Sequence, residues 1–325
     1  MRKEARILFM GTPEFAVASL GALIMNGFNI VAVVSSPDKG AGRGRKVKQS
    51  AVAQYASENY LKLLQPNNLK DPGFLKEIEE LKPDIAVVVA FRMLPEELWL
   101  IPRMGTFNLH ASLLPQYRGA APINHAIING EISSGITTFL IDHKIDTGNI
   151  LLQKELKISY AEDAGELHDR LMRSGAKLVV RTVKLIYSGK AKASNQDKLI
   201  TKNLTLHPAP KIFPKDCFID WSLDTISIYN FIRGLSPYPG ARIVLNNGKR
   251  NILVKFLESK PVFIKQLSKS GLIITDSPGK LIISTFDGYI EIRKLQPEGK
   301  RVMKADEFLR GIDIHSLLLV TDPQV

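Results

Sequence analysis

Short apolar runs alternate with longer amphipathic stretches over roughly the first 190 residues of the chain. The runs are continuous and rich in β-branched residues, which is typical of strands that are buried on both faces. The longer stretches repeat apolar residues with a helical period. This alternation predicts an α/β fold in which a mostly parallel sheet is covered by helices on both faces. The strands are predicted over Ile7–Met10, Ile30–Val34, Asp84–Ala90, Gly105–Leu109 and Ile136–Ile141, and the helices over Glu14–Met25, Ser50–Asn59, Gly73–Leu81, Ile123–Ile128 and Gly165–Tyr187.

Local signals mark the ends of some of these elements. Thr12-Pro13-Glu14 predicts a helix start, with the Thr12 hydroxyl as the cap and Pro13 at the first helical position. Asn26-Gly27 predicts the end of the same helix.

The remainder of the chain has a different pattern. Residues 191–214 are polar and non-periodic and contain three prolines, so they indicate a linker that follows a surface. One amphipathic helix at about Asp224–Leu235 and several short strands follow, which predicts a small antiparallel β-barrel. These strands are Arg242–Leu245, Ile252–Leu257, Gly271–Thr275, Lys280–Ser284 and Gly288–Leu295. We therefore expect a catalytic α/β domain over 1–190, a linker over 191–206 and a β-barrel domain over 207–325.

Composition narrows the class of protein. A chain of 325 residues, with 45% apolar and 23% charged residues, is typical of a soluble protein of two domains. The apolar run Ile7–Met10 is too short for a signal peptide, and no window approaches the roughly 20 apolar residues of a membrane span. The single cysteine, Cys217, excludes an internal disulfide and a cysteine-based zinc site. We expect a cytoplasmic monomer without a bound metal and without a membrane partner.

The net charge of +12 points to an anionic partner, although a generally basic proteome would also produce it. The charge is uneven, because Ser35–Lys48 holds three glycines and five basic residues. The spacing fits neither a P-loop nor a dinucleotide-binding fingerprint. A mobile, strongly positive segment suits an irregular polyanion such as folded RNA. The alternative is a solvated surface loop.

Three polar residues carry the candidate chemistry. Asn108 and His110 lie two positions apart at the carboxyl end of a predicted strand, so both project on the same side of it. Asp146 follows the next predicted strand. If the two strands are neighbours, the three groups converge on the crevice beyond the carboxyl ends of the sheet.

The residue types suit acyl transfer. The Asn108 amide can donate to an oxygen that becomes negative, and His110 can donate or relay a proton near neutral pH. Asp146 can fix the imidazole tautomer or accept a proton. No serine or cysteine nucleophile fits this group, which favours direct transfer without a covalent intermediate. The alternative is a structural Asn–His pair beside a turn capped by aspartate.

Six sequence runs, spread from residue 7 to about residue 241, resemble the methionyl-tRNA formyltransferase family. The longest begins at Asn108-Leu109-His110-Ala111-Ser112-Leu113-Leu114-Pro115 and continues through Gln116-Tyr117-Arg118-Gly119-Ala120-Ala121-Pro122-Ile123. The others are Phe9–Ala16, Asp146–Gly148, Ala209–Ile212, Asp220-Trp221 and Pro237–Ala241.

The resemblance implies a Rossmann-like formyltransferase domain and a C-terminal barrel related to the OB fold. It implies transfer of the formyl group of 10-formyltetrahydrofolate to the α-amino group of methionine on initiator tRNA, a step in translation initiation, with tetrahydrofolate as the other product. By analogy, Asn108, His110 and Asp146 occupy the catalytic positions, and Ser112, Leu113, Leu114 and Pro115 occupy the tetrahydrofolate-binding position. The basic loop would bind the acceptor arm of the tRNA through Arg43, Arg45, Lys46 and Lys48, and the barrel would add a second, broader positive surface.

The chain departs from the family's common pattern at several positions. Phe91-Arg92 stands where a Tyr-Gly pair is frequent, His125 stands where tryptophan is expected, and Asn149 stands where aspartate is frequent. These departures concern the shape of the folate pocket. Two alternative functions remain: a folate-dependent formyltransferase acting on a nucleotide-linked amino sugar or a purine precursor, and a non-catalytic RNA-binding protein. The basic loop argues against the first, and the three polar residues argue against the second.

Overall fold

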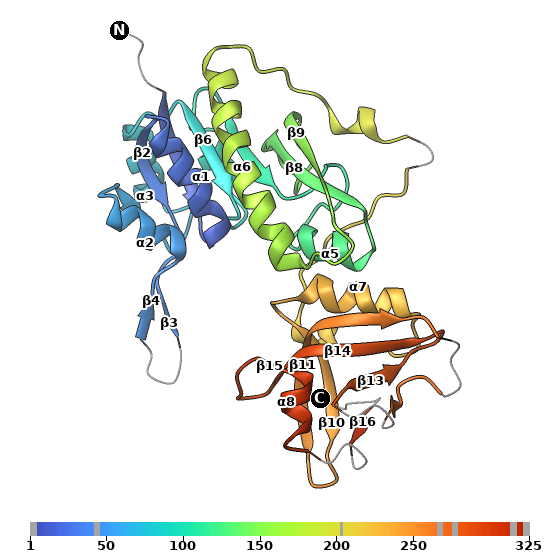
Figure 1. Cartoon of the computed structure of the whole chain (residues 1–325). Coiled ribbons are helices and arrows are strands. Elements are labelled where there is room, and N and C mark those ends of the chain that lie inside the picture. The colour runs from blue at the N-terminus through green and yellow to red at the C-terminus, as the bar shows by residue number, and fades with distance from the viewer. Residues whose placement is uncertain are drawn as a thin grey trace. The chain divides into compact units, whose positions relative to one another are not determined.

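The computed structural model describes residues 5–41, 46–201, 204–264, 269–274, 279–312 and 317–320. The chain forms two compact units that interleave along the sequence (Figure 1). The first contains Met1–Gly119, Ser134–Leu156 and His168–Pro208, and the second contains Ala120–Ser133, Lys157–Leu167 and Ala209–Val325. Two short segments of the predicted N-terminal domain therefore group with the C-terminal part of the chain.

The first unit is built on a seven-stranded sheet of order β5-β2-β1-β6-β7-β8-β9. The neighbouring pairs from β5 to β7 are parallel, and β8 is antiparallel to β7. The structure thus confirms the predicted mostly parallel sheet. At one side of this sheet, β8 runs antiparallel to its neighbour β7. The strands are β1 (Arg6–Gly11), β2 (Asn29–Val34), β5 (Leu63–Leu64), β6 (Ile85–Val89), β7 (Thr106–His110), β8 (Ser133–Leu140) and β9 (Ile150–Lys157).

Helices cover both faces of this sheet, as the continuous apolar strands predict. On one face, alternate residues of the central strands pack against α3 (Pro72–Glu80) and α4 (Glu96–Trp99) in one apolar core. On the other, α6 (Ala164–Tyr187) comes so close to β7 that a Cβ on Gly175 would lie 2.7 Å from the Leu109 side chain. Leu109 thus faces α6, and the residues on either side of it in β7 face away from α6.

Two further helices complete the first unit. Helix α1 (Glu14–Met25) begins after Pro13, which stands at the N-cap without a side-chain hydrogen bond. The predicted cap by Thr12 is wrong, because its hydroxyl lies 3.0 Å from the Ser36 hydroxyl instead. Helix α2 (Ala51–Glu58) is capped by Ser50, whose hydroxyl accepts from the Ala53 N–H. Between β2 and α2, the strands β3 (Lys39–Ala41) and β4 (Lys46–Lys48) pair with each other in a separate two-stranded sheet, which Figure 1 shows extending away from the main sheet.

The second unit is a curved antiparallel sheet that closes most of a small barrel. Its strand order is β12-β13-β14-β11-β10-β16, with β15 beside β14. Each pair of neighbours is antiparallel, which confirms the predicted barrel. The strands are β10 (Ala241–Asn246), β11 (Asn251–Val262), β12 (Ile273–Ile274), β13 (Leu281–Ser284), β14 (Tyr289–Pro297), β15 (Met303–Lys304) and β16 (Leu318–Val320), and α8 (Ala305–Leu309) follows β15.

Helix α7 (Thr225–Leu235) packs on the barrel core and connects it with the two earlier segments of the second unit. Its N-terminus is capped by Asp224, and the hydrogen bonds from Ser227 lower the pKa of that carboxyl group. Asn124, in α5 (Pro122–Ile128), donates to the Gly234 carbonyl at 2.7 Å. The buried Arg233 donates to the Glu162 carbonyl at 2.8 Å. These contacts explain why residues 120–133 and 157–167 group with the C-terminal part. None of the helices in the described ranges combines the length and apolar character that a membrane span requires.

The contact of α5 with α7 generates a stability prediction. We expect Gly234→Ala to lower the free energy of unfolding by about 1–3 kcal/mol, because the added Cβ would lie 2.6 Å from Ile128 Cγ1 and 3.0 Å from its backbone nitrogen. Helix propensity alone would raise it by about 1 kcal/mol. Unfolding by denaturant measures whether the free energy of unfolding falls or rises in this variant. Gly73→Ala, in the first turn of α3, is the control, because its Cβ would meet only an Asp71 carboxylate oxygen at 3.2 Å.

Candidate active site

Strand β7 carries two of the three predicted catalytic residues into the interior of the first unit. His110 is 6% exposed and Asn108 is half-buried. Because Leu109 between them packs toward α6, both lie on the opposite face of the sheet. The Asn108 amide makes no hydrogen bond with any described residue, so its donor is available to a ligand.

The ring of His110 is held in one orientation. Its Nε2 lies 2.8 Å from the Tyr117 carbonyl oxygen. A carbonyl can only accept a hydrogen bond, so Nε2 carries a proton and donates it. Nδ1 then faces Asp146 Oδ2 at 3.8 Å, and both side chains are largely buried. The structure therefore brings His110 and Asp146 together, with Nδ1 as the ring nitrogen that can exchange a proton in front of a carboxylate.

Asp146 reaches this position by a different route from the one predicted from strand order. Because β8 is antiparallel to β7, its carboxyl end at Leu140 lies beside Phe107, and His110 lies beside Thr137. Asp146 thus does not follow a parallel strand into a shared crevice. The loop between β8 and β9 turns back toward the carboxyl end of β7.

The local conformation of this loop explains the Asp-Thr-Gly sequence. Asp146 has φ +56°, a region that aspartate tolerates better than most residues. A Cβ on Gly148 would lie 1.7 Å from the Leu140 carbonyl oxygen, so only glycine fits there. The Gly119 N–H donates to Asp146 Oδ2 at 3.0 Å and fixes the carboxylate that faces His110.

The predicted cofactor-binding run, Ser112–Pro115, follows β7 directly and forms a rigid loop. Thr137, on β8, donates from its hydroxyl to the Ser112 carbonyl at 2.7 Å and accepts from the Leu114 N–H at 3.2 Å. The Gln153 amide donates to the Leu114 carbonyl and to the Thr137 hydroxyl. The side chains of Ser112, Leu114 and Pro115 are buried, and Leu113 is half-buried against Gly135. These side chains therefore pack into the protein beneath the loop and support its backbone.

Three residues that shape the site were missed by the sequence analysis. Thr137 and Gln153 belong to β8 and β9, where a strand pattern gives no sign of their hydrogen bonds. Gln196 lies in the segment interpreted as a linker, and its fully buried amide contacts the backbone of Asp146 and Gly148. Only the three-dimensional arrangement identifies this set.

Two departures from the family pattern have structural consequences. Arg92 follows β6, and its guanidinium donates to the carbonyls of Pro66 and Asn67, so it ties the loop after β6 to the loop after β5. Its Nε is buried without a partner among the described residues, and burial lowers the pKa of the group. His125, on α5, lies with its Nε2 3.0 Å from the Pro210 carbonyl, to which it donates.

Two of the four residues predicted to bind tRNA lie on the β3–β4 pair. Arg43 and Arg45 are outside the described residues. Lys46 and Lys48 belong to β4, opposite Ala41 and Lys39 of β3. Lys39, Lys46 and Lys48 therefore belong to a two-stranded projection of the first unit.

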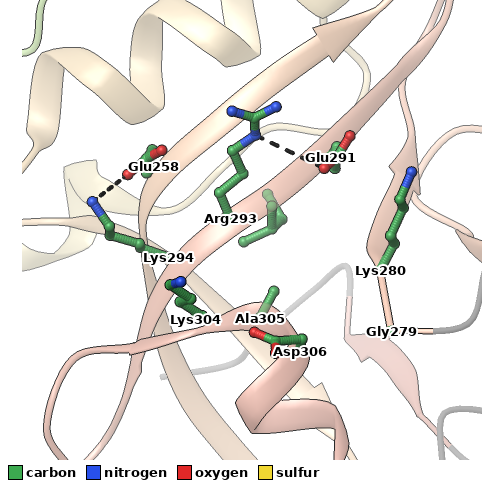
Figure 2. Close-up of a pocket in the computed structure, with 10 residues that line it drawn as sticks. Glu258, Gly279, Lys280, Glu291, Arg293, Lys294, Lys304, Ala305 and Asp306 are labelled. Carbon is green, nitrogen blue, oxygen red and sulfur yellow. Dashed lines mark ion pairs between the residues drawn. The ribbon is translucent and has the colours of Figure 1, made fainter.

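A hollow of about 270 Å³ lies on the barrel of the second unit (Figure 2). Lys294 and Glu258 form an ion pair in it at 2.5 Å, and this hydrogen bond raises the pKa of the lysine. Figure 2 also shows Arg293 directed toward Glu291, at 3.8 Å. Lys280 and Lys304 line the same hollow and form no ion pair with the described residues. Over the described ranges, no three His, Cys, Asp or Glu side chains gather closely enough to bind one metal ion.

Comparison with known proteins places this architecture in a family. Residues 5–183 match the formyl transferase family, and residues 211–313 match the formyl transferase C-terminal domain. A methionyl-tRNA formyltransferase of Bacteroides fragilis is 48% identical over 316 residues, which cover 97% of both chains. A protein of the same name from Azobacteroides pseudotrichonymphae is 50% identical over 311 residues, covering 95% of this chain and 96% of its own.

A solved structure supports the fold. The structure of WlaRD, a sugar 3N-formyl transferase, in the presence of dTDP and 5-N-formyl-THF superposes with a TM-score of 0.62. The match covers 92% of this chain and all of the other, at 23% identity. The sequence relatives cover both parts of the chain at much higher identity. The chain therefore belongs to the formyl transferase family and, within it, to the methionyl-tRNA formyltransferases.

Proposed function

We propose that this chain transfers the formyl group of 10-formyltetrahydrofolate to the α-amino group of methionine on initiator tRNA, as a step of translation initiation. The relatives that match nearly the whole chain carry the name of this activity. The observation on which the chemistry depends is the buried pair of His110 and Asp146, 3.8 Å apart, with the other ring nitrogen fixed by a carbonyl. A purely RNA-binding protein has no use for this pair.

The residues present fit a formyl donor. The Asn108 amide is half-buried and uncommitted among the described residues, on the same face of β7 as His110, where it can donate to a carbonyl oxygen. We propose that the 112–115 loop, which begins two residues after His110, forms one wall of the donor site. Because the side chains of Ser112, Leu114 and Pro115 are buried in the protein, this wall would meet the donor mainly through its backbone.

The reaction is a direct displacement. The bound donor supplies the formyl carbon, which gains a bond to the uncharged amine of methionine and loses its bond to the folate nitrogen. Asn108 and an imidazolium at His110 stabilise the negative charge that develops on the formyl oxygen. Asp146 assists removal of the proton from the amine, and the proton leaves with the folate nitrogen.

The tRNA substrate accounts for the basic character of the chain. The net charge of +12 and the positive residues of the β3–β4 segment suit the phosphates of an acceptor arm. We infer a cytoplasmic enzyme, because charged initiator tRNA is used there. We infer a monomer, because all three catalytic candidates come from one compact unit of a single chain.

The first prediction concerns catalysis. We expect His110→Ala and Asp146→Asn to lower kcat for formylation of methionyl-tRNA by about 10²- to 10⁴-fold, because each removes a proton-transferring group. Asn108→Ala should lower it by about 10²- to 10³-fold through loss of one donor to the developing anion. Steady-state formyl transfer measures kcat, and calorimetric titration with tetrahydrofolate should show that folate binding is retained.

His143→Ala is the matched control, since His143 is an exposed histidine of the same loop as Asp146, and its Nδ1 faces Glu96 at 3.7 Å. It should keep the activity of the wild type. A His110→Ala enzyme with more than a third of wild-type kcat would contradict the assigned chemistry. The proposed substrate would be wrong if the enzyme formylated a nucleotide-linked amino sugar or a purine precursor and did not formylate methionyl-tRNA.

The second prediction concerns the basic segment. Replacing Arg43 and Arg45 together by alanine should raise KM for methionyl-tRNA and leave kcat within about twofold, because phosphate contacts contribute to binding. The slope of log affinity against log salt should become shallower by roughly 1.4 to 1.8 if both contacts are lost. Filter binding at several salt concentrations measures this slope.

The control is the double replacement of Lys190 and Lys192 by alanine, which removes two exposed cations beyond the end of α6. Its salt slope should match that of the wild type. An equal loss of slope in both double variants would mean that only the total charge matters, and it would refute a specific role for the segment.

A further inference from the structure

Gln196 is a fully buried polar residue in a segment that sequence alone assigns to a linker. The segment is docked on the first unit. Ser194 and Ile150 exchange both of their backbone hydrogen bonds at 2.8 Å. Asn195 then caps a short 3₁₀ helix, Gln196–Leu199, by accepting from the Asp197 N–H. The backbone on both sides of Gln196 is therefore fixed, and the side chain is directed inward.

Every part of the Gln196 amide has a partner. Its Nε2 donates to the carbonyls of Asp146, at 3.0 Å, and Gly148, at 2.8 Å. Its Oε1 accepts from Arg118, at 2.7 Å from Nη2 and 3.2 Å from Nε. Carbonyls only accept hydrogen bonds and a guanidinium only donates them. These partners therefore determine which end of the Gln196 amide is the nitrogen and which is the oxygen. A glutamate could pair with Arg118 but would have no donor for the two carbonyls.

These partners belong to the two loops that fix the candidate carboxylate. One loop carries Asp146 and Gly148, and the other carries Arg118 and Gly119. The Gly119 N–H donates to Asp146 Oδ2, the same oxygen that faces His110 Nδ1. Gln196 thus connects the backbone that bears the carboxylate to the side chain of Arg118, the neighbour of the glycine whose N–H holds the carboxylate. It contacts neither the carboxylate nor the imidazole.

We propose that Gln196 is a positioning residue that holds the Asp146 carboxylate against His110 during formyl transfer. The role in catalysis rests on the proposed function. Such positioning affects the rate of the chemical step, because a shift of about 1 Å in a reacting group can lower that rate by about 10²-fold. Gln196 is fully buried, so it is not exposed to a substrate, and substrate binding should depend on it little.

Two substitutions in the full chain test the proposal. Gln196→Met keeps the size of the side chain and removes all of its hydrogen bonds, and Gln196→Glu keeps the pairing with Arg118 only. We expect both to lower kcat by about 10- to 100-fold, with KM for donor and for methionyl-tRNA within about twofold of wild type. If Gln196→Met does not fold, Gln196→Glu carries the test. Wild-type kcat in either folded variant would overturn the proposal.

Gln54→Met is the matched control, because it also removes a glutamine amide that makes a hydrogen bond, here to Glu58 on the exposed face of α2 and outside the site. It should leave kcat and both KM values near those of the wild type. A double-mutant cycle then asks whether Gln196 acts through Asp146. In an Asp146→Asn background, Gln196→Met should cost less than about twofold. If the two substitutions instead lower kcat by independent factors that multiply in the double variant, Gln196 has only a general structural effect. That result would refute the assigned role.

Hydrogen exchange of the substrate-free protein separates this inference from the proposed function. In Gln196→Met, the Gly119 amide should exchange faster, while amides of α7 keep the exchange rates of the wild type. If the wild type forms no formylmethionyl-tRNA, the proposed function fails, and the exchange result still decides whether Gln196 holds these loops. If formylation proceeds and neither exchange nor kcat responds to the substitution, the inference alone fails.

Discussion

The antiparallel pairing of β7 with β8 is the constraint on which the site depends. It places Thr137 beside His110 and sends the carboxyl end of β8 toward the opposite end of β7. The loop after β8 must therefore turn back to bring a carboxylate to the imidazole. That return requires an aspartate at positive φ and a glycine where no Cβ fits, which are the first and last residues of Asp146-Thr147-Gly148.

Turning two loops back over a sheet buries many backbone polar groups, and each needs a partner. In this chain three neutral side chains supply several of these partners. Thr137 and Gln153 satisfy the 112–115 loop, and Gln196 satisfies the loop that carries Asp146. These three side chains carry no charge of their own, and the Arg118 guanidinium joins the network through its hydrogen bonds to Gln196. The site is thus organised by a buried polar network around one titratable pair.

The two units contain different sets of polar and charged groups. The first contains the candidate catalytic groups and the β3–β4 projection with its basic residues. The second has its own apolar core and a hollow that is lined by both acidic and basic side chains. Short segments around α5 and Glu162 join the second unit because buried hydrogen bonds to α7 hold them there.

The sequence by itself determined the features that depend on neighbouring residues. Apolar periodicity located most of the strands and helices, because burial on one or two faces imposes a repeat that can be counted, but it did not predict β9 or α4. The spacing of Asn108 and His110 placed both on one side of β7, and the family motifs identified the chemistry. The strand pattern carries no information on direction, so the antiparallel course of β8 appeared only in the structure.

Tertiary structure also decided which polar residues were satisfied by which partners. Thr12 has the sequence context of a helix cap, yet its hydroxyl lies beside Ser36, which is 24 residues away in the chain. Gln196 lies in a polar, proline-containing stretch that resembles a linker, yet two loops distant in sequence enclose its amide completely. Local patterns report on contacts within a few residues. Hydrogen bonds across 24 to 78 residues form only when the whole unit has folded, because chain packing then brings donor and acceptor together.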